Sequence, residues 1–331
     1  MTLTLIDARA CSLEQVVLSH VQEKTTIPTD LYDAYGRELL TYQQKFKAGL
    51  AQGNVHVGDI LGLAAIEYAG DSTVFKTNQF SFEEYTALRD TAQAALLKGE
   101  RVDPRLLASQ AALSMITLVE SLDNHLIFCH RGGDHLANRY LPPGGFYNYD
   151  TKPGKEFLRG VIFDKVYDRV GVKSFGPVTY LGTSHDDRDS FLFVNVFYQQ
   201  LPVTSREVYE LWKKTPAHSN KPDHLLFVSS GMKPLTDYLF HNGDHTFNQY
   251  SDPPITFKKK AMISGPANHV KREYQHIENG VGAILLYIAH KYGKKTAASF
   301  SQDLVSEKVV SGVDATPLHT GDLNSGLFYS K

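Results

Sequence analysis

The sequence has few cysteines, no excess of charge of either sign and no long apolar run. Its two cysteines, Cys11 and Cys129, are too few for a disulfide framework or a thiolate metal site. A formal net charge of −2 gives no electrostatic attraction to nucleic acid or to an anionic membrane. No apolar run approaches the length that spans a bilayer, and the N-terminus lacks the basic start and apolar core of a signal peptide. We therefore expect a cytoplasmic protein with neither nucleic acid nor a membrane as its partner.

Several catalytic motifs are also missing. The sequence contains no His-Glu-x-x-His zinc motif, no Gly-x-Ser-x-Gly elbow, no glycine-rich phosphate loop ending in Gly-Lys-Ser/Thr and no Cys-x-x-Cys pair. Two basic clusters, at 257–261 and 290–295, are typical of solvated surface. The segment 183–189, rich in His and Asp, lies between two predicted strands. We interpret it as a hairpin tip, with a site for a hard cation as the alternative.

Hydrophobic residues make up 42% of the 331-residue chain, enough to bury a full core in about two domains. We divide the chain into an N-terminal helical and loop region (1–108), a central α/β region (109–245) and a C-terminal helical extension (246–331). In the first region, Ser-x-x-Gln and Ser-x-x-Glu capping boxes predict helices over 12–24 and 81–99.

The central region reads as strands, one helix, further strands and a closing helix. Short apolar runs predict strands, and a run of apolar residues at helical spacing predicts a helix over 155–170. The predicted strands are 111–120, 124–131, 177–183, 190–201 and 224–230, and the closing helix is 233–240. This order indicates a mixed sheet with helices on its faces.

The C-terminal extension contains an apolar stripe at helical spacing from Val270 to Tyr292, followed by Gly293. A helix of this length must cover such a stripe. Packing on its own domain is the plain expectation. We also predict a homodimer through this helix, because the central sheet already has two helices to cover it.

The order of the central elements, together with the Leu-Pro-Pro-Gly-Gly-Phe turn at 141–146, resembles the Nudix hydrolase family. Its motif is Gly, five residues, Glu, seven residues, then Arg-Glu-apolar-x-Glu-Glu-x-Gly-apolar. In this chain the motif extends from Gly145 to Val172, with the first Glu at Glu156, the later glycine at Gly171 and ten residues in place of five. The resemblance covers about 110–245 and implies a Nudix-like α/β/α sandwich.

The charged positions of the motif are degenerate. The family has Arg-Glu where this chain has Asp164 and Lys165, and a Glu pair where it has Asp168 and Arg169. The resemblance implies that, in an active member, Glu156 and Asp168 would hold Mg²⁺. At about 100° per residue, Lys165 shares one helical face with Asp168 and Arg169, so two cations would repel the metal.

Three interpretations of this face remain open. Lys165 and Arg169 could form only local ion pairs, which leaves a structural helix. They could instead grip an anion directly, since Arg offers a bidentate fork and Lys a point charge. In the third interpretation, Glu156, Asp164 and Asp168 form a rearranged acidic set that retains hydrolysis with Mg²⁺.

The resemblance also places a substrate cleft beside the loop that follows strand 124–131. It implies that Arg131 and His135 contact the ligand, together with Gly144 and Gly145 of the turn. We predict that the protein binds a phosphate-containing ligand of nucleoside-diphosphate type, or serves as a scaffold, without standard Mg²⁺-dependent hydrolysis. The alternative is an active hydrolase of a nucleoside diphosphate linked to another moiety, so the sequence leaves enzyme activity open.

Overall fold

The structure is a computed structural model. The residues that it describes are 3–7, 9–24, 26–51, 58–98, 100, 103, 106, 111–131, 139–149, 155–173, 176–186, 192–216, 221–222, 224–240, 245–248, 250, 255–257 and 278–300. Of the helices in this part of the chain, none has both the length and the apolar character needed to cross a membrane.

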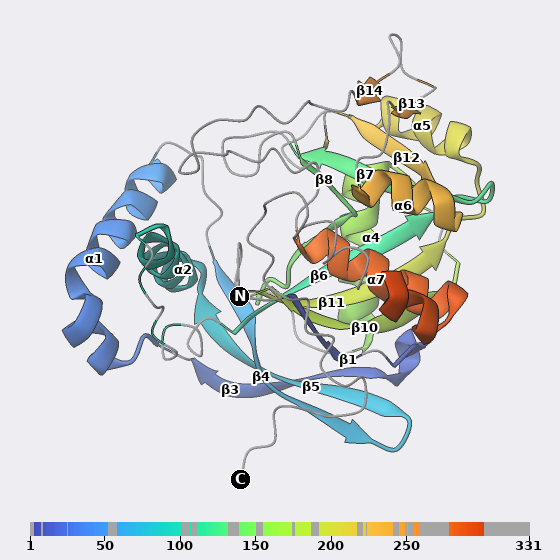
Figure 1. The fold of residues 1–331 in the computed structure, drawn as a ribbon. Helices are drawn as coiled ribbons and strands as arrows, with labels where there is room; N and C mark the ends of the chain where they lie inside the picture. Colours follow the sequence, from blue (N-terminus) through green and yellow to red (C-terminus); the bar gives the residue numbers. More distant parts are fainter. Residues whose placement is uncertain are drawn as a thin grey trace.

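Twelve strands form one mixed sheet (Figure 1). Its main path runs through β1 (Leu3–Asp7), β10 (Val178–Asp186), β11 (Leu192–Gln200), β6 (Ala112–Glu120), β4 (Asp59–Ala69), β5 (Ser72–Ser81) and β3 (Val16–Lys24). Off this path lie β2 (Cys11–Ser12), β7 (His125–Arg131), β8 (Arg139–Leu141), β9 (Gly144–Phe146) and β12 (Leu225–Ser229). The β6–β11 and β3–β5 pairs are parallel. A separate pair joins β13 (His245–Asn248) to β14 (Ile255–Phe257).

Side chains of the sheet alternate between two apolar clusters, because successive residues of a strand point to opposite faces. Along β6, Ile116 and Leu118 belong to one cluster, and Met115 and Val119 belong to the other. The first cluster is completed by α1 (Thr29–Ala51), α2 (Phe82–Leu97), α6 (Met232–Phe240) and α7 (Glu278–Tyr292). The second is completed by α4 (Lys155–Val170) and α5 (Ser205–Lys214). This arrangement confirms the predicted α/β class with a mixed sheet.

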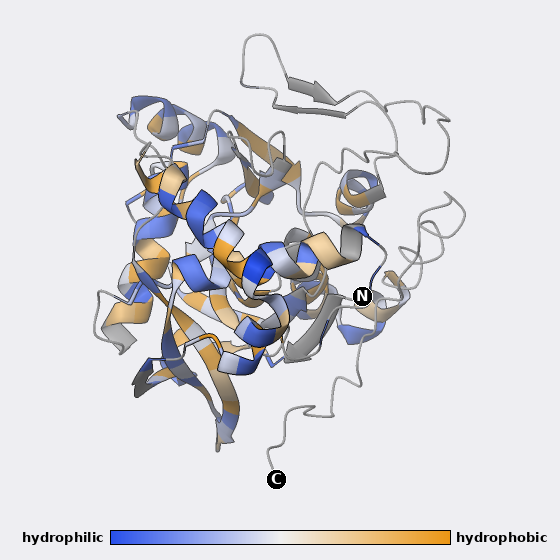
Figure 2. Ribbon diagram, turned by 90° about the vertical axis from the view of Figure 1, so that its left-hand side faces the viewer, coloured by the Kyte–Doolittle hydropathy of each residue, from blue (hydrophilic) through white to orange (hydrophobic). Residues whose placement is uncertain are grey.

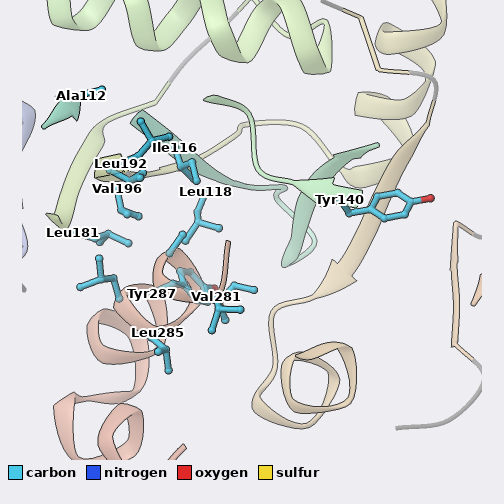
Figure 3. Packing of buried hydrophobic residues seen from close by; sticks show 14 of the residues in the cluster. Ala112, Ile116, Leu118, Tyr140, Leu181, Leu192, Val196, Val281, Leu285 and Tyr287 are labelled. Carbon is cyan, nitrogen blue, oxygen red and sulfur yellow. The ribbon is translucent and has the colours of Figure 1, made fainter. Parts of the chain in front are cut away.

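Helix α7 packs against the sheet of its own chain. Figure 3 shows Val281 and Tyr287 of α7 next to side chains that project from the strands, among them Leu181 and Leu118. All four are at most 5% exposed. In Figure 2 the helices at the surface carry hydrophobic and hydrophilic residues in turn, as expected of helices with one buried side.

The packing of α7 bears on the predicted dimer contact. Leu285 and Ile288, which we expected to meet their mates across a two-fold axis, are 1% and 0% exposed within the single chain. These two side chains are therefore taken up by their own core, as in the plain expectation. Homodimerisation itself stays a prediction. The first residues of the predicted stripe, 270–277, lie outside the described part of the chain.

The central elements agree with the sequence prediction. Strands β6, β7, β10, β11 and β12 and helices α4 and α6 lie where apolar runs and helical spacing placed them. Helix α2 also confirms the prediction for 81–99, and the Glu83 amide donates to Ser81 Oγ at its start. Gly293 ends α7 with a φ of 92°, and its amide donates to the Ala289 carbonyl.

The N-terminal helix predicted over 12–24 is wrong. A 3-10 helix covers only Leu13–Gln15, and Val16–Lys24 is strand β3. The expected helical and loop-rich region also contains strands β1, β4 and β5, which join the central sheet. Helices α1 and α2 confirm that the described part of that region also contains helices. The division of the chain into three domains stays a prediction.

The Pro-Pro-Gly-Gly turn transfers the chain between two neighbours within the sheet. Before the turn, β8 pairs with β7, and after it β9 pairs with β6. The Thr117 amide of β6 donates to the Pro143 carbonyl at 2.8 Å, which fixes the turn to the sheet. Helix α4 then begins after residues 150–154, which lie outside the described part of the chain.

Candidate functional site

Helix α4 is amphipathic, and its packing determines which charged residues face outward. Leu158, Ile162, Val166 and Val170 recur at helical spacing and are at most 1% exposed. Between them, Lys165, Asp168 and Arg169 are half-buried, and Asp164 is exposed. The predicted charged face therefore exists, and its members lie along the border of the buried stripe.

A close approach to a neighbouring helix explains the Val-Gly-Val end of α4. Gly171 has a φ of 76°, which favours glycine, and its amide donates to the Tyr167 carbonyl. A Cβ at this position would lie 2.4 Å from Thr215 Oγ1 and 3.0 Å from Trp212 Cα. The glycine of the motif is thus needed for the contact between α4 and the end of α5.

The two glycines of β9 are close to other atoms in different ways. A Cβ on Gly144 would lie 2.3 Å from the Met115 carbonyl oxygen and 3.1 Å from Ile116 Cα, so no side chain fits there. Gly145 has a φ of 157°. Its virtual Cβ lies 3.6 Å from Lys165 Nζ and 3.5 Å from Lys165 Cε. The structure thus brings together three predicted ligand contacts, Gly144, Gly145 and Lys165.

Lys165 is short of negative charge. Burial lowers the pKa of its ammonium below the ordinary lysine value, and the Arg169 guanidinium lowers it further. Asp168 and Asp164 raise the pKa but do not reverse the shift. In the described part of the chain, no carboxylate lies within ion-pair distance of Lys165. Lys165 therefore forms no ion pair with Asp168, and the three interpretations of this face stay open for Arg169 and Glu156.

Arg169 lies close enough to Cys129 of β7 for its charge to affect the thiol. Burial raises the pKa of Cys129 to about 12, and the positive charge of Arg169 opposes this shift. Cys129 is 5% exposed and is therefore a small buried residue. Its high pKa makes it a poor nucleophile.

The residues on this face do not fit a magnesium site. Two of the positions that hold carboxylates in the family motif carry an ammonium and a guanidinium here, at Lys165 and Arg169. Oxygen ligands bind Mg²⁺, and cations repel it. Among the residues that the structure describes, no three His, Cys, Asp or Glu side chains converge as a metal site would require.

The structure does not describe the side chains of three predicted site residues. Glu156 lies in the first turn of α4 and Arg131 ends β7, but the side chains of both are outside the described part of the structure. His135 lies outside the described residues altogether. Of the segment 183–189, His185 lies in β10 and its ring stacks on Phe193 at 4.3 Å. Strands β10 and β11 pair antiparallel around it, as a hairpin requires.

A buried polar cluster joins α7 to the end of β6, and the sequence reasoning did not find it. Glu120 is 1% exposed and accepts hydrogen bonds from Lys291 Nζ and Tyr198 Oη, both at 2.6 Å. Lys291 Nζ also donates to Tyr287 Oη at 2.7 Å and to Ser230 Oγ at 3.0 Å. Only the position of Lys291, one helical turn after Tyr287, could have indicated it.

This cluster controls the ionisation of Glu120. Burial alone would raise the pKa of its carboxyl group, but hydrogen bonds from Lys291, Ser230 and Tyr198 hold it below the ordinary glutamate value. Conversely, burial and the neighbouring Glu120 raise the pKa of Tyr198. The hydrogen-bonded Glu120 carboxylate links α7 to the sheet. In this it differs from the charged residues of α4.

Comparison with known proteins adds little to this geometry. No family model matches the chain, and no curated protein matches it. A MutT/nudix family protein from Enterococcus faecalis is 11% identical over 65% of this chain and 80% of its own, with a TM-score of 0.31. The E. coli ORF135 protein is 13% identical over 36% of this chain and 74% of its own, with a TM-score of 0.24. At such low TM-scores, neither likeness carries an argument about fold or function.

Proposed function

We propose that residues 109–245 form a Nudix-like α/β/α sandwich that binds a phosphate-containing ligand of nucleoside-diphosphate type through Lys165 and Gly145. In this proposal the ligand is held without standard Mg²⁺-dependent hydrolysis. The observation that carries the proposal is the position of the Lys165 ammonium. It lies next to Gly145 of β9, and no described carboxylate is paired with it.

The electrostatics of Lys165 support an anion in this place. Its lowered pKa means that the surroundings penalise the ammonium, and a bound phosphate would reverse this penalty. Arg169, on the same face, adds a second positive charge, and guanidinium groups suit phosphate oxygens. Both cations therefore attract an anion, whereas they would repel a metal ion.

The backbone at Gly145 supports a close approach. Because Gly145 has no side chain, Lys165 can reach the strand closely from α4, and its ammonium would hold a phosphate oxygen beside the strand. Gly144 cannot carry a side chain without meeting Met115 of β6, so β9 stays tightly held against the sheet. The strand β9 and the Lys165 side chain that reaches it from α4 together form a cradle for one phosphate group.

The proposal is tested by a panel of ADP, ADP-ribose and UDP-glucose, with and without MgCl2. Each compound is assayed for product release by chromatography and for its effect on the melting temperature. We expect at least one compound to stabilise the protein without being cleaved. Binding to the native state alone stabilises it by about 2.7 kcal/mol at a hundredfold excess over Kd.

Lys165→Gln is the decisive variant. It keeps a long polar side chain and removes the charge, and we expect the Kd of the stabilising compound to rise about tenfold, equivalent to about 1.4 kcal/mol. Lys173→Gln is the matched control, because Lys173 follows α4 and lies over the Tyr167 ring at 5.0 Å. Cleavage that requires Mg²⁺ and is lost in Asp168→Ala would reject the proposal in favour of a hydrolase.

A further inference from the structure

A pocket of about 510 Å³ is lined by the N-terminal segment 9–15, the turn between β4 and β5 and the C-terminal part of α7. Two of its lining residues, Leu181 of β10 and Leu286 of α7, belong to the apolar cluster that α7 completes, whereas α4 packs in the opposite cluster. The pocket is therefore distinct from the face of α4. Its volume is within the range of about 300–1,000 Å³ that is usual for small-molecule sites.

The lining of the pocket is mostly polar and carries charge of both signs. Asp71, in the turn between β4 and β5, supplies a carboxylate, and Lys294, just beyond the end of α7, supplies an ammonium. Both residues are exposed. In the described part of the chain, neither of them forms an ion pair, with the other or with a third residue. The pocket thus presents one negative and one positive group, each without an internal counter-ion.

Gln15 and Thr73 add neutral hydrogen-bonding groups to the lining. The side-chain oxygen of Gln15 accepts from the Ser12 amide at 3.0 Å and from Ser12 Oγ at 3.1 Å. These bonds orient the Gln15 amide and leave its NH2 group to donate. The hydroxyl of Thr73 can donate or accept. The Arg9 guanidinium, also in the lining, is engaged elsewhere, since it lies 3.8 Å from the centroid of the Tyr68 ring.

This pattern of charge distinguishes between classes of ligand. Lys294 would attract a simple anion, but Asp71 would repel it, and a simple cation would meet the reverse. An apolar ligand would remove water from both charged groups without replacing its hydrogen bonds. A molecule that carries both charges can pair with the carboxylate and with the ammonium at once.

We propose that this pocket binds a small zwitterion of the α-amino acid class. The ammonium of the ligand would pair with Asp71. Its carboxylate would pair with Lys294 and accept a hydrogen bond from the Gln15 amide. These three partners come from segments that are distant in sequence, so the ligand would link the N-terminal segment to the β4–β5 turn and to the end of α7. The site is independent of the phosphate site proposed at Lys165.

Thermal unfolding and calorimetric titration of the full chain with the common L-amino acids test this proposal, because a ligand that binds the native state raises the melting temperature. The amino acid that binds most tightly is then compared with two of its derivatives. The N-acetyl derivative lacks the ammonium, and the carboxamide lacks the carboxylate. We expect the zwitterion to bind at least about tenfold more tightly than either derivative, since each derivative leaves one charge of the pocket without a partner.

Two variants assign the charges of the ligand to residues of the pocket. Asp71→Asn should weaken the binding of the amino acid about tenfold without weakening that of the N-acetyl derivative, which has no ammonium to lose. Lys294→Gln should weaken the amino acid by a similar factor without weakening the carboxamide. The controls Asp33→Asn and Lys295→Gln, at exposed residues outside the lining, should change neither.

The proposal is overturned if no amino acid binds at millimolar concentrations, or if one of the two derivatives binds as tightly as its parent. It is also overturned if the amino acid keeps its affinity in both Asp71→Asn and Lys294→Gln. The Lys165→Gln variant separates the two proposed sites, because it should retain the affinity for the amino acid. Loss of binding in this variant would place the amino acid on the α4 face and overturn the pocket proposal. The absence of amino-acid binding would leave the function proposed at Lys165 unaffected.

Discussion

Replacing Lys291 by Met would leave a buried carboxylate without its main partner. Glu120 is 1% exposed, and the Lys291 side chain is 31% exposed, so the carboxylate is shielded from water and the ammonium is only partly shielded. Removing one member of a fully buried pair costs about 3–5 kcal/mol. Because the ammonium of Lys291 retains part of its hydration, we expect a smaller loss, about 2 kcal/mol in the free energy of unfolding.

The effect should depend on pH with a definite sign. The folded-state pKa of Glu120 lies below its ordinary value, so its ion pair contributes stability above the unfolded pKa of about 4.3. That contribution is lost as the pH falls through the lower, folded-state pKa. The difference in stability between wild type and Lys291→Met is therefore full near neutral pH and shrinks in acid.

Urea unfolding of both proteins at about pH 7 and at about pH 3.5 measures this difference. Lys295→Met is the matched control, because it removes the same group from an exposed position four residues along the chain. We expect the control to change stability by less than about 0.5 kcal/mol. The reasoning is refuted if the loss in Lys291→Met is equal at both pH values, or if the control loses as much.

Two further predictions concern backbone space and thiol reactivity. Gly144→Ala should destabilise the fold by about 1–3 kcal/mol in urea unfolding, because the new Cβ meets the Met115 carbonyl at 2.3 Å. Gly160→Ala, in α4 with nothing within 4 Å of the added Cβ, should instead stabilise it by about 0.5–1 kcal/mol, and the opposite order would contradict this account. Iodoacetamide at pH 8 should modify Cys11, which is half-exposed, well before Cys129, whose pKa is about 12 and which is buried. Mass spectrometry of the two peptides would show equal rates if this burial were wrong.

The central elements could be predicted because local pattern and tertiary packing agree there. In α4 the apolar spacing from Leu158 to Val170 is helical, and the same residues are buried. The strands β6 and β7 are short apolar runs that are buried on both faces, which is how a central strand reads in sequence.

The prediction failed at β3 because a correct local signal was extended too far. The Ser12 and Gln15 side chains do form a capping box, but it caps a single 3-10 turn. Val16 and Leu18 are buried in alternation, and β-branched valines favour a strand. Their partner is β5, which pairs with β3 in parallel from a distant part of the sequence, and local spacing contains no information on it.

The charged face of α4 could be predicted as a face, but its balance of charge could not. Helical spacing placed Lys165, Asp168 and Arg169 together. The place of the Lys165 ammonium, away from the described carboxylates, depends on its rotamer and on Gly145, which comes from another element. The pocket lined by Arg9, Asp71, Leu181 and Lys294 was missed for a similar reason, since these residues are far apart in the sequence.

Because β1 pairs with β10, this edge of the sheet can form only after β10 has been synthesised. Leu3 leaves the ribosome long before its partner Asp186, because the two residues are distant in sequence. Until then β1 has no strand to pair with. One apolar face of the sheet also stays without α7 until that helix has been synthesised. Contacts so distant in sequence slow folding and prolong the exposure of strand edges. Such a chain should depend on chaperones more strongly than its modest size suggests.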